Sequence, residues 1–495
     1  MSPNANSHPP RRKPYRIIYQ ADTSWGMQNS RDAADYLSGM VDFLDTTHVD
    51  ALFWHDGSGG NNAYYDSEVM ELNGARIGKV EPLLLQMIEE GNDPPAIMLK
   101  AARERGVDVF YSFRINDCHD SLDDGKAMPQ LLATFKLEHP EWLIGKGHPY
   151  GGIMQLNFAV PEVREFKFAI IEEAARKYDF DGFEIDFQRS APYFIPGTEP
   201  ENAPILTDFL RRVRDHLKQR GSERGRSLAL AVRVPESMEA CRLNGFDVAA
   251  WVQEDLVDMI ILGSSAIDIE VEAFKALTQG TDILVYPCLY GWPSGYGKFT
   301  PEMCRALATN YWFQGADGIY TFNWNAHTYT QRPDEEHLGQ FGYQMELLRE
   351  IDEPEQLRGK DKEFAADRVG GRRNSFGYIW SYPHNWMHCV LPAVVDSSGT
   401  SGEPKSVVVP ILVGEDLESP RPSHVQLRVE MVEQAHDELL GLAINGQGLT
   451  KQDREGVTIT APVDPDCLTT GRNQVEVTAV AGIVEVTKMW IDVSY

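Results

Sequence analysis

The feature that most constrains the fold is a regular alternation of short apolar segments and longer amphipathic segments from about residue 15 to residue 350. The short segments are rich in β-branched and aromatic residues, and the longer ones, such as 163–177 and 204–220, repeat apolar residues at helical spacing. Eight strands are predicted, at residues 15–20, 49–54, 107–113, 182–187, 228–234, 257–262, 283–289 and 318–322. Because no GxGxxG turn follows the first strand, eight such repeats predict a closed (β/α)8 TIM barrel over residues 15–352.

The pattern changes after about residue 360, where helical spacing fades and Gly, Pro, Asn and Asp separate short alternating segments. Strands are predicted at residues 375–381, 406–412, 425–432, 457–461, 475–480 and 484–493. This pattern predicts a C-terminal all-β sandwich over residues 368–495. The charged segment 353–367 is the predicted linker, and the polar, proline-rich residues 1–14 are predicted to form a disordered tail.

The charge of the chain limits its partners. With 46 Lys and Arg residues against 74 Asp and Glu residues, the net charge is -28, which disfavours binding to nucleic acid and to anionic membranes. The sequence has no run of about 18 apolar residues that would predict a membrane span, and no signal-peptide core, so we expect a cytoplasmic protein. The six cysteines lie far apart, which argues against a zinc knuckle or a disulfide framework. We expect no cofactor, and the sequence is compatible with a homo-oligomer.

Polar and aromatic residues gather where the predicted barrel strands end. In a βα barrel these carboxyl ends converge on one mouth, which is where such enzymes hold their reactive groups. The candidates for substrate contact are Asp22, Trp54, His55, Asp56, Arg114, Asn116, Asp117, His119, Gln188, Arg189, Arg233, Trp292, Asn323 and Trp324. Indole rings beside acids and amides suit a sugar, whose CH face stacks while its hydroxyls need donors and acceptors. We therefore expect a carbohydrate substrate, and the arginines point to an acidic one.

The fourth predicted strand carries two acids at alternate positions. Strand alternation places Glu184, Asp186 and Gln188 on one face, and three apolar residues, at 183, 185 and 187, on the other. The apolar face must pack against the helices, so the polar face is expected to point into the barrel. Two carboxyls roughly 7 Å apart on one strand can hold different charge states, as glycoside hydrolysis requires.

The partner of Asp186 is open among three acids. Glu184 shares its strand, Glu236 ends the neighbouring fifth strand, and Asp117 ends the third. We expect Asp186 to be the nucleophile or base in a wet, aromatic-walled pocket, with Glu236 as the first choice for proton donor, because neighbouring strand ends can face one sugar ring from two sides, and Glu184 as the other candidate. An alternative is that Glu184 and Asp186 form structural ion pairs with one of three arginines, namely Arg114, Arg189 and Arg233.

Two segments around the fourth strand resemble a known family. Residues 156–165 read LNFAVPEVRE, and residues 178–187 read YDFDGFEIDF. Together they resemble the family-10-like glycosyl hydrolases of bacteria, βα barrels with a PEVR segment and a YDxDGIxxD fourth strand whose closing aspartate lies at the site. That aspartate is Asp186 here, and Phe183 replaces the isoleucine. The resemblance implies a glycoside hydrolase with Asp186 in its site.

Two further similarities concern the chemistry and the second domain. The strand is similar to the DxxDxDxE motif of chitinases, but Glu184 replaces the second aspartate and Gln188 replaces the final catalytic glutamate. This departure argues against chitinase-type substrate-assisted catalysis. Residues 471–473, Gly-Arg-Asn, are similar to the G-x-N turn of jelly-roll sandwiches appended to carbohydrate enzymes, so a jelly-roll-like domain is expected.

The sequence therefore predicts a barrel glycoside hydrolase that cleaves a poly- or oligosaccharide by carboxylate acid–base catalysis. One alternative is a non-catalytic carbohydrate-binding barrel, which the glutamine at 188 suggests. Another is a metal-dependent barrel enzyme, an isomerase or deacetylase, that uses His55, Asp117 and His119.

Overall fold

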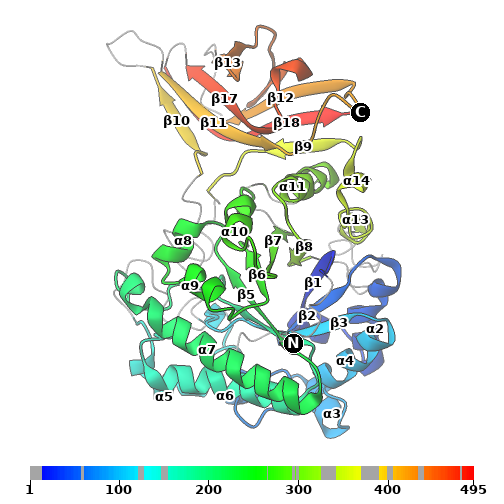
Figure 1. Ribbon diagram of the computed structural model, residues 1–495, viewed down its shortest axis with the longest axis vertical. Helices are drawn as coiled ribbons and strands as arrows, with labels where there is room; N and C mark the ends of the chain where they lie inside the picture. Colours follow the sequence, from blue (N-terminus) through cyan, green and yellow to red (C-terminus); the bar gives the residue numbers. More distant parts are fainter. Residues whose placement is uncertain are drawn as a thin grey trace, which may run out of the picture.

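The first part of the chain forms a closed parallel barrel. The computed structural model describes residues 14–56, 61–120, 128–145, 154–264, 266–291, 296, 300–324, 342–369, 389–397, 405–432, 440–479 and 482–495. Its barrel strands, in spatial order, are β1 (Ile17–Asp22), β2 (Ala51–His55), β3 (Asp108–Phe113), β4 (Gly182–Asp186), β5 (Ala229–Val234), β6 (Met259–Leu262), β7 (Leu284–Tyr290) and β8 (Ile319–Phe322). β8 pairs with β1 and closes the ring (Figure 1), so the predicted TIM barrel is confirmed.

Helices lie between the strands and around the barrel (Figure 1). They are α1 (Thr23–Gln28), α2 (Ala33–Val41), α3 (Pro82–Glu89), α4 (Pro94–Glu104), α5 (Thr134–Glu138), α6 (Pro161–Lys177), α7 (Glu199–Arg224), α8 (Met238–Leu243), α9 (Val248–Gln253), α10 (Val271–Leu277), α11 (Pro301–Phe313), α13 (Gly342–Leu347) and α14 (Pro354–Leu357). The predicted helix 163–177 matches α6 within two residues. The helix predicted at 204–220 begins earlier in the structure, at Glu199, so Pro204 lies inside α7.

The barrel strands bury both faces, and alternate residues separate two apolar layers. The inner layer includes Phe53 and Phe110, whose rings stack 4.4 Å apart. The outer layer packs the other side of the same strands against the helices and includes Leu52 and Trp54 of β2. The parity of a residue along its strand therefore decides whether its side chain can reach the barrel interior.

The C-terminal part is a sandwich of two antiparallel sheets. Their strands are β9 (Lys362–Ala365), β10 (Ala393–Asp396), β11 (Lys405–Val413), β12 (His424–Met431), β13 (Leu440–Ile444), β14 (Gln447–Gly448), β15 (Asp453–Glu455), β16 (Thr458–Pro462), β17 (Gly471–Ala479) and β18 (Ile483–Ser494). One sheet has the order β10-β18-β12-β16-β15, with β9 also paired to β18, and the other has the order β11-β17-β13-β14. The predicted all-β sandwich is therefore confirmed.

The segment between the two parts differs from the prediction. Residues 353–367, predicted as a linker, contain α14 and β9, and β9 pairs with β18 in the C-terminal sheet. Residues 1–13 and the predicted strand 375–381 lie outside the described residues. Within the described part of the chain, no helix combines the length and apolar character needed to cross a membrane.

The sandwich packs on α11 and reaches the loops that follow β6 and β7 (Figure 1). In the loop after β6, Asp268 forms an ion pair with Arg472 of β17 at 2.6 Å. In the loop after β7, the Tyr296 hydroxyl donates to the carbonyl of Ala366. The C-terminal sandwich thus lies beside the carboxyl end of the barrel.

Candidate active site

Strand β4 directs two acids into the barrel. Its apolar residues Phe183 and Ile185 pack in the outer layer, as the alternation predicts. Glu184 lies in register with Ser112 of β3, and Asp186 lies in register with Arg233 of β5. Both carboxyls are therefore surrounded by inward-facing side chains of neighbouring strands, with Asp186 one layer closer to the mouth.

Asp186 forms a buried ion pair. Its Oδ2 accepts a hydrogen bond from Arg233 Nη2, and its Oδ1 accepts from the backbone N–H of Arg189 at 3.1 Å. The side chains of Arg233 and Asp186 are 0% and 2% exposed. Burial lowers the pKa of Arg233, but the attraction of Asp186 outweighs it, so the pKa is raised above its ordinary value. The structural ion pair considered as an alternative for Asp186 is therefore present, and the expected wet setting is not seen in the described residues.

Glu184 has a different environment. Its Oε2 accepts hydrogen bonds from Ser112 Oγ and from the Tyr320 hydroxyl, the latter at 3.2 Å. Burial raises the pKa of Glu184 to about 7, against the effect of Arg233, and the charge of Asp186 adds to the rise. At neutral pH this carboxyl therefore carries its proton in a large fraction of molecules.

Asp117, His119 and Arg189 form a hydrogen-bonded chain at the ends of β3 and β4. Asp117 Oδ1 lies 2.6 Å from His119 Nδ1, and Arg189 Nη2 lies 2.9 Å from His119 Nε2. Because a guanidinium group only donates, Nε2 is the acceptor and Nδ1 carries the proton. Burial raises the pKa of Asp117, but contact with His119 and the charges of the nearby arginines hold it well below its usual range.

The first two strands add an acid and a neutral histidine. Asp22, at the end of β1, lies 3.4 Å from Arg114 Nη2, and its side chain is 25% exposed. Burial, reinforced by the charge of Arg114, lowers the pKa of His55 well below its ordinary value, so the imidazole is neutral at pH 7. The side chains of Asp22, His119 and Arg189 are 25%, 21% and 11% exposed. They are therefore the residues of this site that reach solvent.

Four predicted contact residues point elsewhere. Trp54 lies in the outer layer between Tyr65, Tyr111 and Phe180, behind the barrel wall. Trp324 is buried there too, with its Nε1 donating to the Leu289 carbonyl. These two placements contradict the prediction of aromatic plates lining the mouth: Trp54 has the outward parity of β2, and Trp324 lies beyond the end of β8, after Asn323, whose φ is 52°.

The other two are polar. Asp56 accepts a hydrogen bond from the hydroxyl of Tyr111, an outer-layer residue. Asn116 uses its amide to bind the backbone of Leu156 and the Pro192 carbonyl. Asp56 therefore contacts the outer layer, and Asn116 holds loop backbone in place. Gln188 and Asn323 are half-buried, and Trp292 lies outside the described residues.

Glu236 lies toward the junction with the sandwich. It is buried, and its charge contributes to the raised pKa values of Asp367 and Cys389, two residues of the segment around β9 and β10. Glu184, by contrast, lies two residues from Asp186 on β4, and the charge of Asp186 raises its pKa. The described contacts therefore place Glu184, more directly than Glu236, beside Asp186.

Four interior residues were not predicted. Ser112 and Tyr320 bind Glu184, and the ring of Phe322 contacts the arginines of the cluster. Gln20 is buried on the inner side of β1, and neither its amide oxygen nor its amide nitrogen has a hydrogen-bond partner among the described residues. Strand parity is the signal that could have found all four, since each shares the inward parity of its strand.

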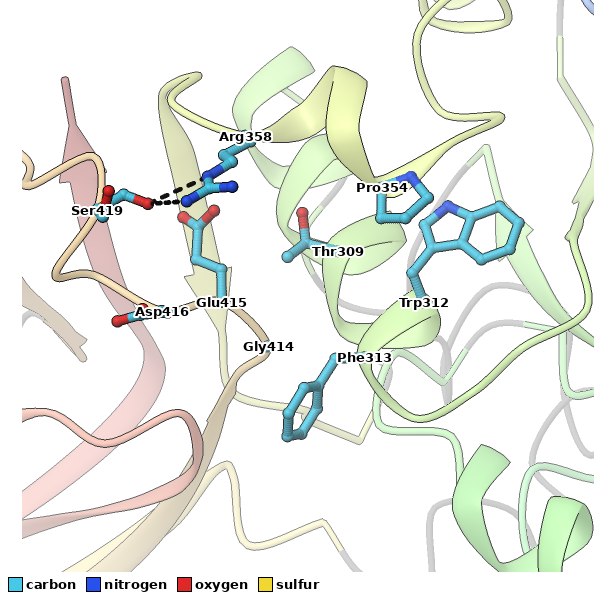
Figure 2. A pocket seen from close by; sticks show the side chains of 9 residues that line it. All are labelled: Thr309, Trp312, Phe313, Pro354, Arg358, Gly414, Glu415, Asp416 and Ser419. Atoms are coloured by element: carbon cyan, nitrogen blue, oxygen red, sulfur yellow. Dashed lines mark hydrogen bonds between the residues drawn. The ribbon is translucent and has the colours of Figure 1, made fainter.

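Two further features of the described residues bear on the alternatives. No group of three or more His, Cys, Asp or Glu side chains there is arranged to hold a metal ion. Both ring nitrogens of His119 contact protein atoms, Asp117 Oδ1 and Arg189 Nη2. A cavity of about 320 Å³ lies between α11, α14 and the sandwich (Figure 2), lined by Thr309, Trp312, Phe313, Pro354, Arg358, Gly414, Glu415, Asp416 and Ser419. It shares no residue with the candidate site.

The comparison with protein families gives one match. The family described as glycosyl hydrolase-like 10 matches residues 25–205, which contain β2, β3 and β4 and therefore both Glu184 and Asp186. This match supports a glycosidase-like barrel and agrees at that level with the resemblance seen in residues 156–187. No curated protein matches the chain.

Solved structures with similar folds include several carbohydrate enzymes. The glycoside hydrolase domain of PgaB (BpsB) from Bordetella bronchiseptica is 12% identical, with 68% of this chain and 98% of that chain covered and a TM-score of 0.44. Alpha-L-fucosidase isoenzyme 2 from Paenibacillus thiaminolyticus is 9% identical, with 97% and 100% covered and a TM-score of 0.42. The maltogenic alpha-amylase AmyB from Thermotoga neapolitana is 10% identical, with 94% and 99% covered and a TM-score of 0.40.

Proposed function

We propose that the chain hydrolyses glycosidic bonds at the carboxyl end of its barrel, with Asp186 and Glu184 as the reacting carboxyls. The observation that carries the proposal is the unequal setting of two acids on one strand. Asp186 is paired with Arg233, and Glu184 has a pKa raised to about 7 by burial. Glycoside hydrolysis uses two carboxyls in unlike settings, one of which donates a proton, and Glu184, with its raised pKa, can keep a proton for that step near neutral pH.

The proposed reaction follows from these charge states. The protonated acid donates its proton to the glycosidic oxygen as the bond to the anomeric carbon breaks. Asp186 stabilises the positive charge that develops on the sugar ring, or attacks the anomeric carbon, and water then supplies the hydroxyl of the new reducing end. Glu184 is the first candidate for the acid, and Glu236 is the alternative from the next strand.

The remaining cluster residues suit substrate binding. Asp22, His119 and Arg189 are partly exposed, so they can exchange water for sugar hydroxyls. Arg114 and Asp117, more deeply placed, hold the exposed groups in position through ion pairs.

One observation favours a second candidate, a carbohydrate-binding barrel without turnover. Asp186 is almost fully buried and its Oδ2 is occupied by Arg233, so substrate would have to approach Oδ1 or displace the pair. In that case sugar would bind at the mouth and the acids would serve only to hold the arginines.

Hydrolysis of aryl glycosides and labelled oligosaccharides tests the proposal. We expect turnover by the wild-type chain, and a loss of kcat of at least about 1,000-fold in Asp186→Asn. If Asp186 is the nucleophile, Asp186→Ala should form a glycosyl azide in the presence of azide. Binding without turnover on the whole panel, with Asp186→Asn changing affinity alone, would support the binding barrel and refute the hydrolase.

Leaving-group dependence identifies the proton donor. A variant that lacks the acid should keep activity on dinitrophenyl glycosides, which need no protonation, and lose it on unactivated oligosaccharides. We expect this split in Glu184→Gln and not in Glu236→Gln. The reverse result would assign the acid to Glu236.

A further inference from the structure

Three arginines surround a single aromatic ring inside the barrel. The guanidinium carbons of Arg233, Arg114 and Arg189 lie 4.0, 5.3 and 6.0 Å from the centre of the Phe322 ring. They come from the ends of β5, β3 and β4, and we call them the arginine cluster. Three like charges around one buried ring repel each other, so the arrangement needs anions to be stable.

The acids present neutralise this cluster unevenly. Arg233 is tightly paired with Asp186, but Arg114 lies 3.4 Å from Asp22, and Arg189 Nε lies 3.8 Å from Asp117. Asp117 is already bound by both the ring and the backbone of His119. Arg114 is therefore held less closely than Arg233, and burial together with the charge of Arg114 lowers the pKa of Arg189 to about 10.

Buried donors in the same region lack acceptors. Nε of Arg114, and Nε and Nη1 of Arg233, have no hydrogen-bond acceptor among the described residues. Arg114 is 4% exposed and Arg233 is fully buried. Buried polar groups of this kind are normally satisfied, and one left without a partner costs about 1–3 kcal/mol. The interior thus offers unused positive donors that a bound anion could satisfy.

We propose that the arginine cluster binds the carboxylate of an acidic sugar, so that the substrates are glycans containing uronic acid. A planar carboxylate matches the fork of a guanidinium group, and Arg114, whose Nε has no acceptor among the described residues, can bind it while the charge of Arg189 adds to the attraction. Gln20, two residues before Asp22 on β1, has no partner for either amide atom among the described residues and can bind sugar hydroxyls. The proposal rests on the proposed function only in taking the barrel mouth as the sugar site.

The proposed preference for acidic sugars runs against the net charge of the chain. The chain carries a net charge of -28, so long-range electrostatics oppose any anionic glycan. A preference for acidic sugars must then come from local contacts. Salt screens the long-range repulsion more than it screens buried pairs, so higher ionic strength should leave uronate binding unchanged or slightly stronger.

Calorimetric titration of the full chain tests the proposal without requiring turnover. The probes are oligosaccharides of glucuronic and galacturonic acid, their neutral glucose and galactose counterparts, and sulfated forms of the neutral ones, titrated into wild type and Asp186→Asn. We expect the uronates to bind at least about 10-fold more tightly than the neutral sugars. Equal affinity for neutral sugars, or tighter binding of the sulfated forms, would overturn the carboxylate assignment.

Variants locate the site. Arg114→Gln and Arg189→Gln leave partly exposed or already bonded acids behind, so both should fold, which thermal unfolding checks. Each should lower uronate affinity about 10-fold and leave neutral-sugar affinity unchanged. Arg189→Lys should recover part of the loss, and Arg421→Gln, an exposed arginine of the sandwich, should bind like wild type. Unchanged uronate affinity in both glutamine variants would refute the assignment.

The two proposals fail in different ways. Tight uronate binding without hydrolysis would refute the hydrolase and leave the arginine cluster as an anion site. Hydrolysis of neutral glycans with no response to the arginine variants would keep the hydrolase and refute the acidic substrate.

Discussion

At the scale of single residues, the barrel interior holds its acids in different ways. Asp186 has a permanent cation beside it, whereas the donors that bind Glu184 among the described residues are two hydroxyls in a desolvated setting. A carboxyl in the first setting stays charged, and one in the second gains from keeping its proton. This difference has consequences for stability as well as for catalysis.

The raised pKa of Glu184 predicts a loss of stability as pH rises. An unfolded glutamate titrates near pH 4.3, so between about pH 4 and pH 7 the folded chain keeps a proton that the unfolded chain has lost. The stability gained from this proton on Glu184 is therefore fully present below the pKa of the unfolded chain. It is lost as pH rises through about 7, and the loss of unfolding free energy is roughly 4 kcal/mol at most. Glu184→Gln should remove this slope in urea unfolding measured from pH 4 to pH 8, and the exposed Glu138→Gln should not. An unchanged slope in Glu184→Gln would contradict the environment described for Glu184.

Breaking the Asp186–Arg233 pair from one side should be costly. Arg233→Leu leaves a buried carboxylate without its cation, which costs about 3–5 kcal/mol of unfolding free energy. Adding Asp186→Asn should restore most of that loss, because the stranded charge is gone. Arg176→Leu, which removes an exposed pair with Glu68, should cost less than about 1 kcal/mol. Equal losses of unfolding free energy in Arg233→Leu and Arg176→Leu, measured by urea unfolding, would show that solvent screens the buried pair as it screens the exposed one.

At the scale of elements, β4 and β2 show what sequence could and could not predict. The alternation of acids with Phe183 and Ile185 was enough to predict the parity of β4, and hence the inward direction of Asp186. β2 reads Ala-Leu-Phe-Trp-His and is buried on both faces, so its parity was not visible and Trp54 was assigned to the wrong side. The role of Asn116 depends on which loop carbonyls need donors, a property of the assembled backbone that no local pattern reveals.

Some residues of the β4 motif serve the fold, and others face the candidate site. Asp181, at the amino end, accepts from the Val109 backbone N–H at 2.9 Å and from Arg226 at 2.8 Å. Gly182 is needed for space, because a Cβ there would lie 2.3 Å from the Phe110 ring and 2.7 Å from the Ala229 carbonyl oxygen. The Asp-Gly pair therefore joins β4 to its neighbours, and only Asp186 and Glu184 face the proposed chemistry.

Substitution of Gly182 tests this division. Gly182→Ala should lower the free energy of unfolding by about 3 kcal/mol or more, because one contact is with backbone and cannot move aside. Gly448→Ala is the matched control, since a Cβ at that position meets no atom within 4 Å. A thermal unfolding shift no larger than that of the control would mean that β4 has room for a methyl group at this position.

At the scale of the whole molecule, barrel and sandwich share structural elements. Ala306 of α11 is part of the apolar core of the sandwich, and β9 both follows α14 and pairs with β18. Lys362 of β9 is fully buried and forms an ion pair with Glu415 at 2.9 Å. Charge in residues 353–367 suggested a linker, but Lys362 and Glu363 use their charges in ion pairs with Glu415 and Arg428 of the sandwich.

This sharing predicts that the two parts unfold together. Asn310 of α11 donates to the Leu412 carbonyl at 3.0 Å and accepts from the Gly414 N–H at 2.7 Å, so one buried amide joins the barrel layer to the end of β11. Scanning calorimetry of the full chain should show a single transition whose calorimetric and van't Hoff enthalpies agree. Asn310→Ala leaves the Leu412 carbonyl and the Gly414 N–H without this partner, so it should lower the free energy of unfolding by about 1–3 kcal/mol and the transition midpoint with it. Gln219→Ala, on the exposed side of α7, should leave the midpoint unchanged. Two resolved transitions in the wild type would mean that the junction contributes too little to couple barrel and sandwich, and the loops after β6 and β7 would then be held by the barrel alone.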